Sequence, residues 1–365
     1  MEPLVPRSAL RPHLPVIGVD VGGTKVAALV VAPDGMVLCR LERPMVSHDP
    51  AAGLAHVVDL VREAPAGAGG PGSLAAVGIG VPGRVDAQSR TVELAVNLGW
   101  TGVALGDEVS GALGVPCLVE NDVRVAAAGL LDTAADGVLS LAYVAVGTGI
   151  GAGIVLAGQL YRGVRGMAGE IGHVVVDPAG ARCRCGLRGC LETVAAGPAI
   201  ERRAREALAA GRPSSLAGGP VTTEAVYRAA SSGDALAREI VESAGVALAR
   251  AIHGLVMTCD LERVLIGGGV ARAGESFMRP IEAELVRLRR ASPLATQMVA
   301  EHTVSLLPPD YDAVAWGAVA LARRISSGGP GERGDGKREV GTPNQEQAES
   351  PADPGVPDRT QPRDH

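Results

Sequence analysis

The sequence predicts an α/β protein in which parallel or mixed sheets are covered by alanine-rich helices. Three observations predict this class. Of the 365 residues, 47% are hydrophobic but only 2% are aromatic, so the core has to be built from Val, Leu, Ile and Ala. Short β-prone runs alternate along the chain with segments of helical apolar spacing. Strand pairs around a glycine turn occur twice, so the two halves of the chain resemble each other in pattern.

Length and charge limit the classes of function. A chain of this length suggests about two domains. The formal net charge of -6 argues against broad attraction to nucleic acid or to anionic membranes. The first sixteen residues, "MEPLVPRSALRPHLPV", lack the apolar segment and cleavage site of a secretory signal. We therefore expect a soluble globular protein of the cytoplasm, with neither a nucleic-acid nor a membrane partner.

The first half predicts a meander followed by alternating helices and strands. The run "LPVIGVDVGGTKVAALVVAPDGMVL" predicts three strands joined by a glycine turn and a "PDG" turn. Helical spacing follows in "DPAAGLAHVVDLVREA", and "LAAVGIGVPGRVD" returns to a strand. The segment "GDEVSGALGVPCLVENDVRVAAAGLL" predicts a helix, the strand "PCLVE" and a helix that begins at "ND".

The second half begins with an uncharged stretch, 137–161, that is long enough to cross a bilayer. Its glycines instead favour two strands, "LSLAYVAV" and "AGIVLAGQL", joined by "GTGIG". Helices are expected around 198–210, 222–230 and 234–258, with the strand "RVLIGGG" after them. Residues 326–365 lack apolar periodicity and predict a disordered tail, and residues 1–15, interrupted by prolines, predict a flexible start.

Two glycine turns are candidates for phosphate binding. Asp20 ends an apolar strand and is followed by Gly22, Gly23 and Thr24. Such a turn can direct backbone N–H groups and a hydroxyl toward phosphate oxygens, while the carboxylate reaches a hydrated Mg²⁺ ion. An ordinary hairpin turn is the alternative interpretation.

The second turn, Gly147–Thr148–Gly149, is neither a P-loop nor a dinucleotide turn that opens a helix. Two such turns suggest jaws that close on one nucleotide. A third glycine run, Gly267, Gly268 and Gly269, ends a strand and could support the sugar or base of that nucleotide, or simply pack.

Glu120, Asn121 and Asp122 lie between a buried strand and a helix. Helix capping is the common use of Asn or Asp there. The functional interpretation has Asp122 accept a proton from a substrate hydroxyl, which suffices for phosphoryl transfer because positioning and charge stabilisation supply most of the acceleration.

A cysteine and histidine cluster, H-x9-C-x-C-x4-C, predicts a closed tetrahedral zinc site. Its ligands are His173, Cys183, Cys185 and Cys190. A nucleic-acid finger would require a base-stacking aromatic residue that the segment lacks, and a reducing compartment disfavours a disulfide. Glu170 and Glu192 bracket the cluster, where they could bind a polyhydroxylated ligand or merely solvate the loop.

Together the motifs resemble the ROK family of bacterial sugar kinases and sugar-responsive repressors, within the actin-like ATPase superfamily. The motifs, in chain order, are "DVGGTK", "GIGVPGRVD", "VNLGW", "ENDV", "GTGIGAGI", "GMAGEIGH", "CRCGLRGCLE" and "IGGGV". The resemblance implies two actin-like (ribonuclease H-like) domains, with mixed sheets flanked by helices and a cleft between them. The small domain would comprise 16–122 with 310–325, and the large domain, 123–309, would contain the zinc motif.

The resemblance also implies a reaction, its cofactors and its site residues. ATP with Mg²⁺ would phosphorylate the 6-hydroxyl of a hexose, Asp122 would be the general base, and structural Zn²⁺ would orient His173. The implied sugar ligands are Asn97, Asn121, Asp122, Glu170, His173 and Glu192. The implied nucleotide ligands are Asp20, Gly22, Gly23, Thr24, Lys25, Gly147, Thr148, Gly149, Gly267, Gly268 and Gly269.

Glucose is the expected substrate, because the pocket motifs look like those of family glucokinases. Kinases of N-acetylmannosamine, N-acetylglucosamine, fructose and allose share these motifs, and Leu191 stands where many glucokinases have an aromatic residue, so the hexose stays open. Polyphosphate as a donor also stays open. A non-catalytic sugar sensor is the alternative of another class, while fifteen residues before Val16 are too few for a repressor's DNA-binding module. Relatives are commonly dimers or tetramers, so a homo-oligomer is expected.

Overall fold

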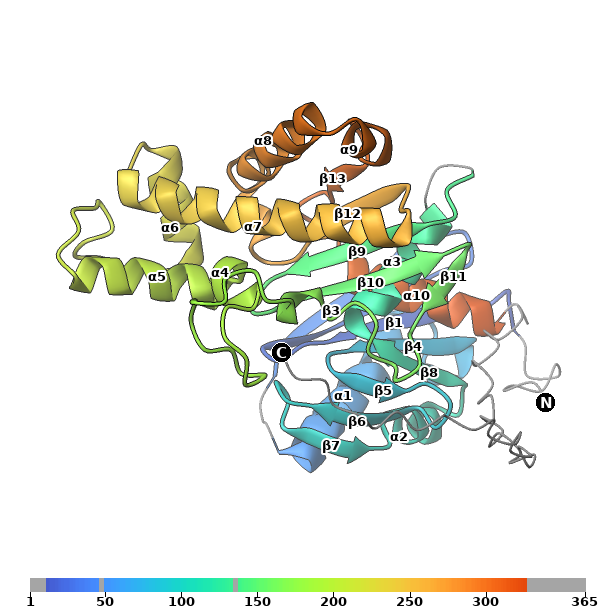
Figure 1. The fold of residues 1–365 in the computed structure, drawn as a ribbon. Helices are drawn as coiled ribbons and strands as arrows, with labels where there is room; N and C mark the ends of the chain where they lie inside the picture. The colour runs from blue at the N-terminus through green and yellow to red at the C-terminus, as the bar shows by residue number, and fades with distance from the viewer. Residues whose placement is uncertain (1–10, 46–48, 134–136, 327–365) are drawn as a thin grey trace, which may run out of the picture. The chain divides into compact units, whose positions relative to one another are not determined.

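Two five-stranded sheets with helices around them form the structure, a computed structural model (Figure 1). It describes residues 11–45, 49–133 and 137–326. The expected α/β class with mixed sheets flanked by helices is confirmed. The expectations for residues 1–10 and 327–365 lie outside the described residues. Ser326, expected to begin the tail, is instead the buried last residue of a helix.

The first sheet has the strand order β3-β2-β1-β4-β8. Its strands are β1 (Val16–Val21), β2 (Lys25–Val31), β3 (Val37–Pro44), β4 (Ala76–Val81) and β8 (Cys117–Asn121). The first three form an antiparallel meander, whereas β4 and β8 run parallel to β1. A smaller antiparallel sheet follows β4, made of β5 (Arg84–Asp86), β6 (Thr91–Ala95) and β7 (Trp100–Val103).

The second sheet repeats this topology, with the order β11-β10-β9-β12-β13. Its strands are β9 (Leu141–Val146), β10 (Ile150–Leu156), β11 (Gln159–Tyr161), β12 (Arg263–Gly267) and β13 (Val304–Leu306). Again the first three are antiparallel and the last two are parallel to the first. The run "AGIVLAGQL", expected to be one strand, is divided by a turn at Ala157 and Gly158, both with positive φ.

Helices join and cover the sheets. In chain order they are α1 (Pro50–Glu63), α2 (Leu105–Leu113), α3 (Asp122–Thr133), α4 (Glu192–Ala195), α5 (Gly197–Ala209), α6 (Thr223–Ser231), α7 (Ala235–Cys259), α8 (Glu275–Ala291), α9 (Pro293–Met298) and α10 (Ala313–Ser326). Within the described residues, short 3₁₀ turns lie at Ala64–Ala68, Pro71–Ser73, Ile171–His173 and Ala271–Ala273.

Helix α10 packs tightly on β1 and β4 as well as on α3. A Cβ atom on Gly18 would lie 2.3 Å from the carbonyl oxygen of Ala315, and one on Gly78 would lie 2.0 Å from that of Ala318. Glycines in the strands therefore let the C-terminal helix approach the backbone of the first sheet directly.

Helix α7 is long and apolar enough to cross a membrane by length and composition alone. Its apolar residues, among them Leu248 and Ile252, are buried in the core around the second sheet, and α6 and α8 pack against it. The uncharged stretch 137–161 forms strands, as the sequence predicts.

Candidate active site and metal centre

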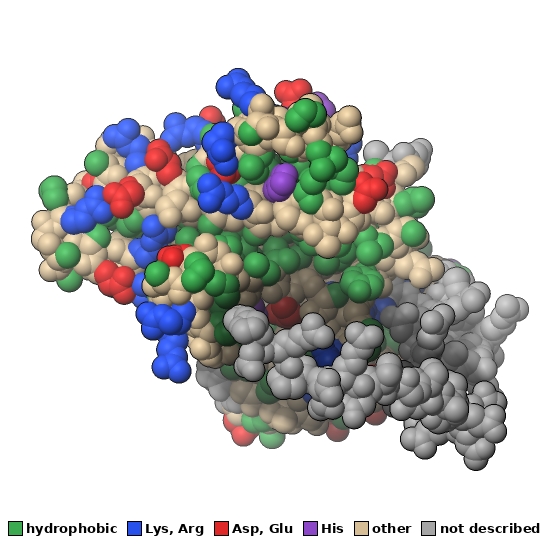
Figure 2. Space-filling view, in the orientation of Figure 1, with side chains coloured by type: hydrophobic (Ala, Val, Ile, Leu, Met, Phe, Trp, Pro, Cys, Tyr) green, Lys and Arg blue, Asp and Glu red, His purple; other side chains and the backbone are tan. Residues whose placement is uncertain are grey.

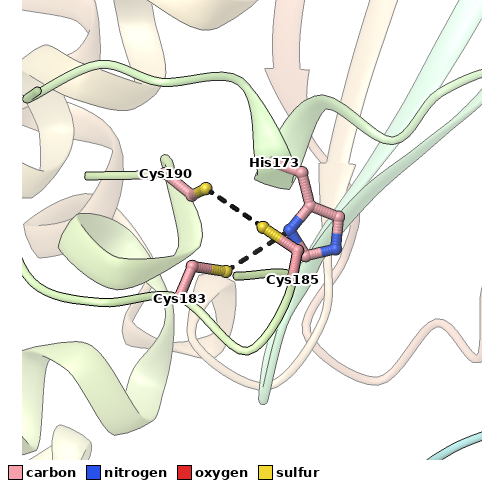
Figure 3. Close-up of side chains that lie close together, drawn as sticks. All are labelled: His173, Cys183, Cys185 and Cys190. Atoms are coloured by element: carbon pink, nitrogen blue, oxygen red, sulfur yellow. Dashed lines mark hydrogen bonds between the residues drawn. The ribbon is translucent and has the colours of Figure 1, made fainter. Parts of the chain in front are cut away.

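The four residues predicted to hold a metal ion lie together in the structure (Figure 3). One ligand atom from each of His173, Cys183, Cys185 and Cys190 lies within 4.8 Å of all the others. His173 comes from the 3₁₀ turn Ile171–His173, and the cysteines come from the loop that runs into α4. Gly189 has φ +69°, and a Cβ there would meet the backbone of Asp177, so this tight loop requires glycine.

The spacing of the ligand atoms suits a tetrahedral ion. Cys183 Sγ is 3.5 Å from His173 Nδ1, and Cys185 Sγ is 3.6 Å from Cys190 Sγ. Sulfurs bound to one zinc ion at about 2.3 Å are separated by roughly 3.8 Å in a tetrahedron. Burial raises the pKa of Cys183 to about 12 and also raises that of Cys190, and a metal ion bound to these sulfurs would favour their thiolate forms.

The two ring nitrogens of His173 have different neighbours. Nδ1 is on the side of the thiols, and it is also 3.8 Å from Glu192 Oε1. Nε2 lies 4.0 Å from Glu170 Oε2. One ring nitrogen can therefore bind metal while the other stays available, beside a carboxylate, for a hydroxyl group.

Glu192 links the cysteine cluster to the second glycine turn. Its Oε1 is 3.2 Å from Cys183 Sγ, and a Cβ on Gly149 would lie 3.2 Å from its Oε2. Leu191, the preceding residue, is fully buried in the core of the second sheet. Glu192, the first residue of α4, thus lies between the metal centre and Gly149.

Asp122 is the first residue of α3, and Asn121 precedes it as the last residue of β8. Asn121 caps the helix, because its Oδ1 accepts a hydrogen bond from the Arg124 N–H. Its amide Nδ2 donates to Gly83 O at 3.1 Å and to Asp122 Oδ1 at 3.0 Å. Asn121 is therefore the residue that caps the helix, and its side chain also orients the Asp122 carboxylate.

Four carboxylates interact near the end of β1. Burial, together with the negative charges of Asp312 and Asp122, raises the pKa of Asp20 to about 8. Burial also raises the pKa of Asp122, to which the charge of Glu170 contributes. Glu170, Asp122 and Asp20 are therefore close enough to interact electrostatically, although they come from distant parts of the sequence.

The first glycine turn is closed by a hydrogen bond from Gly22 N to Lys25 O at 2.8 Å. Lys25 Nζ pairs with Glu42 of β3 at 2.8 Å, so its ammonium group is held at the sheet surface. The backbone of Asn97, in the turn between β6 and β7, lies against Gly23, where a Cβ would be 3.4 Å from Asn97 O. Thr24 is exposed beside them.

The second and third glycine runs are neighbours. Gly147 N donates to Gly149 O at 2.9 Å, and Gly147 O accepts from Gly197 N at the start of α5. A Cβ on Gly268 would lie 2.5 Å from Val146 O, and one on Gly147 would lie 3.8 Å from Gly269 N. The structure thus brings Gly147–Gly149 and Gly267–Gly269 together at the ends of β9 and β12.

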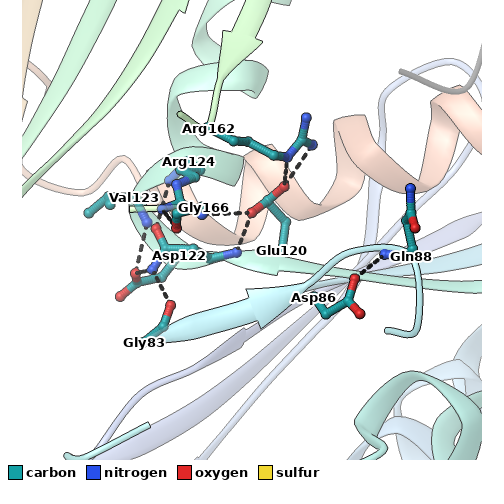
Figure 4. A network of polar contacts seen from close by, with 10 residues as sticks. Gly83, Asp86, Gln88, Glu120, Asp122, Val123, Arg124, Arg162 and Gly166 are labelled. Atoms are coloured by element: carbon teal, nitrogen blue, oxygen red, sulfur yellow. Dashed lines mark hydrogen bonds and ion pairs between the residues drawn. The ribbon is translucent and has the colours of Figure 1, made fainter. Parts of the chain in front are cut away.

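Sequence reasoning missed several residues of this region. Asp312 caps α10, with Oδ1 accepting from Ala315 N, and it pairs with Arg40 at 3.2 Å. The available signal was an Asp before an apolar helix, which indicates a cap and nothing more. Glu120 is buried and paired with Arg162 and Arg124 (Figure 4). A glutamate inside an apolar strand is a signal for such a pair.

Basic and acidic side chains are interspersed over the visible face of α5 and α6 (Figure 2). Ion pairs Arg202–Glu206 and Arg205–Glu201 join side chains of α5, and Arg228–Glu224 joins side chains of α6. One cavity, of about 420 Å³, lies beside α3 and α10, and another, of about 580 Å³, is lined by α5, α7 and the loop around Asp177.

Comparisons with known proteins agree with the sequence motifs. The model of the ROK family matches residues 16–325. A glucokinase of Halalkalibacterium halodurans is 36% identical over 275 residues, which cover 73% of this chain and 83% of that protein. A kanosamine kinase of Amycolatopsis mediterranei is 35% identical over 315 residues, which cover 86% of this chain and 97% of that protein.

The structure is also similar to a ROK family glucokinase from Streptomyces griseus, solved in complex with glucose and AMPPNP. The TM-score is 0.70 at 32% identity, and the match covers 85% of this chain and 99% of that one. The expectation of a two-domain actin-like fold is confirmed by this likeness.

Proposed function

This chain belongs to the ROK family, and from that premise we propose that it is an ATP-dependent hexose kinase whose preferred acceptor is glucose. The reaction transfers the γ-phosphoryl group of ATP to the 6-hydroxyl of the sugar. Relatives named glucokinase support the choice of glucose. The observation that carries the proposal is that Asp122 interacts electrostatically both with Glu170, among the proposed sugar ligands, and with Asp20, beside the first glycine turn.

Asp122 is the proposed general base. Its carboxylate accepts the proton of the sugar 6-hydroxyl as that oxygen bonds to the γ-phosphorus and the bond to the ADP oxygen breaks. Burial raises the pKa of Asp122, which makes its carboxylate a stronger base once it is ionised. The Asn121 amide and the Val123 N–H hold the Asp122 Oδ1 atom in place, at 3.0 and 2.9 Å.

The sugar is bound by side chains from both lobes. Glu170 and Glu192 can accept hydrogen bonds from sugar hydroxyls, and His173 Nε2 faces the same region as Glu170. Asn97 approaches from the turn beside Gly23. Asn121 acts mainly through Asp122, because its amide is already bonded within the protein.

The glycine turns are proposed to hold the nucleotide. Backbone N–H groups of Gly22, Gly23 and Gly149, with the hydroxyls of Thr24 and Thr148, suit phosphate oxygens because both threonines are exposed at their turns. Gly268 and Gly269 extend the second turn toward the ribose. Mg²⁺ supplies charge neutralisation of the phosphates, and the carboxylate of Asp20 suits this hard cation.

Zn²⁺ supplies rigidity to the loop when it is bound by His173, Cys183, Cys185 and Cys190. Nδ1 is the histidine atom that faces the three sulfurs, so binding there fixes the tautomer and leaves Nε2 with its proton. A donor Nε2–H beside Glu170 can bond to an acceptor oxygen of the sugar.

An amino hexose is the second candidate for the substrate. The kanosamine kinase relative matches over 97% of its length, a larger share than the glucokinase of Halalkalibacterium halodurans. The carboxylates of Glu170 and Glu192 would also suit an ammonium group on the sugar. N-acetylmannosamine and N-acetylglucosamine belong in the same comparison.

The testing experiment is a panel of sugars with ATP and Mg²⁺, scored by kcat/KM. Glucose, kanosamine, N-acetylmannosamine, N-acetylglucosamine, fructose and allose are compared, with polyphosphate as a second donor. The proposal expects the highest kcat/KM for glucose with ATP. A higher value for kanosamine would transfer the assignment to the amino sugar. Sugar binding without release of ADP would favour a non-catalytic sensor, against which Asp20, Asp122 and Thr148 weigh.

We make three further proposals, on the lobe boundaries, the location and the oligomeric state. We assign 16–122 with 310–325 to the small lobe and 123–309 to the large lobe, because each range contains one of the two sheets. A cytoplasmic location suits the reduced thiolates of the zinc cluster. A homo-oligomer is proposed from the family, and sedimentation of the purified protein tests it.

A further inference from the structure

Figure 4 shows a buried ionic network between the strand that leads to Asp122 and the loop that leads to Glu170. At its centre is Glu120 of β8, whose side chain is 3% exposed. Glu120 Oε2 accepts hydrogen bonds from Arg162, at 2.8 Å from Nε and 2.7 Å from Nη2. Arg162 directly follows β11, so this pair connects a strand of the first sheet to the edge of the second.

A second arginine extends the network. Arg124, four residues after Glu120, has a side chain that is 4% exposed, and its Nη1 lies 3.6 Å from Glu120 Oε1. Its Nη2 donates to the carbonyl oxygen of Gly166. Gly166 lies four residues before Glu170, on the same loop as Arg162.

The same carboxylate also holds the backbone beside the proposed base. Glu120 Oε1 accepts a hydrogen bond from Asn121 N at 2.8 Å, immediately before Asp122. The Glu120 side chain therefore makes three connections. It bonds to the backbone N–H of Asn121, next to Asp122, and to Arg162 at one end of the segment 162–166. Through Arg124 it is also linked to Gly166 at the other end.

Buried charges make these contacts stiff. Glu120 and Arg124 are almost fully buried, so solvent screens their charges poorly, whereas the side chain of Arg162 is 28% exposed. A neutral residue at position 120 would remove the carboxylate that pairs with Arg162, and it would leave the buried Arg124 guanidinium with its hydrogen bond to Gly166 but without the charge of Glu120. The loop before Glu170 would then lose its attachment to β8.

We propose that Glu120 is a positioning residue, which sets the separation between the Asp122 carboxylate and the sugar-binding loop that carries Glu170 and His173. The inference rests on the proposed sugar kinase function. Glu120 touches neither substrate, and its effect is exerted through Arg162 and Arg124. Its loss should impair alignment of the sugar hydroxyl while leaving the nucleotide turns intact.

The test compares Glu120→Gln with a matched control, Glu284→Gln. Glu284 of α8 is likewise buried, 5% exposed, and paired with two arginines, Arg250 at 2.8 Å and Arg287 at 2.6 Å. It contacts none of the proposed site residues. Both variants should lower the melting temperature, because each removes a buried carboxylate that pairs with two guanidinium groups.

Steady-state kinetics distinguish positioning from stability. Glu120→Gln should lower kcat/KM for the sugar by about 10- to 100-fold, since small misplacements of reacting groups have effects of that size. Its KM for ATP should stay within about twofold of wild type, because uniform binding of the donor is untouched. Glu284→Gln should keep wild-type kinetics at a temperature where circular dichroism shows it folded.

A double-mutant cycle tests the route through Arg162. Glu120→Gln combined with Arg162→Gln should be no worse in sugar kcat/KM than Glu120→Gln alone, because both changes break the same contact. Independent, additive losses would overturn the proposed route. Wild-type sugar kinetics in folded Glu120→Gln, or a loss equal to that of Glu284→Gln, would overturn the positioning role. Wild-type protein that phosphorylates no sugar would instead overturn the proposed function itself.

Discussion

Gly129 of α3 lies so close to Gly317 of α10 that a Cβ added to Gly129 would be 2.5 Å from the Gly317 Cα atom. In the other direction, a Cβ on Gly317 would be 2.2 Å from the carbonyl oxygen of Val125. The two helices cross in contact through their backbones. Asp122 is the first residue of α3, so this crossing also determines where the proposed base is held.

Gly317→Ala is expected to destabilise the protein strongly. The new methyl group meets backbone atoms that cannot rotate away, so the helices must separate, and we expect a loss of about 2 kcal/mol or more in the free energy of unfolding. Urea denaturation followed by circular dichroism measures it. An unchanged denaturation midpoint would show that the crossing can relax.

Gly254→Ala provides the control for this change. Gly254 is also inside a helix, α7, but no atom lies within 4 Å of its ideal Cβ position. Alanine there should stabilise the protein by about 0.5–1 kcal/mol, because it reduces the backbone entropy of the unfolded chain without a clash.

Asp122→Asn is expected to remove catalysis while leaving the sugar bound. Asparagine has the same shape but cannot accept the hydroxyl proton, so kcat should fall by about 10²- to 10⁴-fold. The dissociation constant for sugar, measured by calorimetry, should change much less. A variant with a wild-type kcat would exclude Asp122 as the base.

The pH dependence of the wild-type enzyme reports the same carboxylate. Burial raises the pKa of Asp122, so the acidic limb of the kcat/KM profile should lie above the range of an ordinary aspartate, about pH 3.9. Activity is lost as pH falls through that raised pKa, because the base becomes protonated. Protonation of Asp20, whose pKa is raised to about 8, also contributes to this limb, so the residual activity of Asp122→Asn should lose only the contribution of Asp122.

Asp20→Asn should stabilise the ligand-free protein while abolishing activity. The folded pKa of Asp20 is raised to about 8, whereas the unfolded chain has its ordinary value of 3.8. Between these values the folded state binds a proton that the unfolded state releases, so wild-type stability falls as pH rises through this window.

The advantage of Asp20→Asn in melting temperature should therefore grow from pH 4 to pH 8 and then level off. The difference in the free energy of unfolding is several kcal/mol at most, because the size of the pKa shift sets its upper limit. Melting curves at a series of pH values measure the difference. A constant difference between the two proteins at all pH values would show that Asp20 titrates normally.

Cys190→Ser is expected to abolish stoichiometric zinc binding and to weaken sugar binding. With Zn²⁺ absent, His173 loses its fixed orientation, and we expect KM for the sugar to rise by about 10-fold or more. Atomic absorption gives the zinc content, and sugar titrations give KM. Cys259→Ser, at the end of α7 and away from the cluster, should retain both zinc and activity.

The fold was predictable because local signals and tertiary structure agree along most of the chain. Residues 16–44 predict three strands and form β1 to β3, since their apolar runs and turns leave little alternative. The division at Ala157 and Gly158 was missed, because a short turn inside an apolar run gives no break in hydrophobicity. Ser326, predicted to begin the tail, is instead the last residue of α10, because helix ends carry weak signals.

The candidate site was predictable where ligands are close in sequence. The spacing of Cys183, Cys185 and Cys190 suffices to predict a metal cluster, and the structure assembles it with His173. The role of Glu120 and the proximity of Asp312 to Asp20 depend on contacts between distant segments. Such contacts follow from the topology, which periodicity in a single sequence does not provide.

The shared strand order of the two sheets places one glycine turn at the same point in each lobe, between the first and second strands. The residues beside the two turns nevertheless differ in charge. The first turn is flanked by Asp20 and Lys25, whereas the second is flanked by Val146 and Ile150. If the two turns hold the phosphates of ATP as proposed, the near-symmetric scaffold presents them with an asymmetric charge, which would favour one direction of the donor over the other.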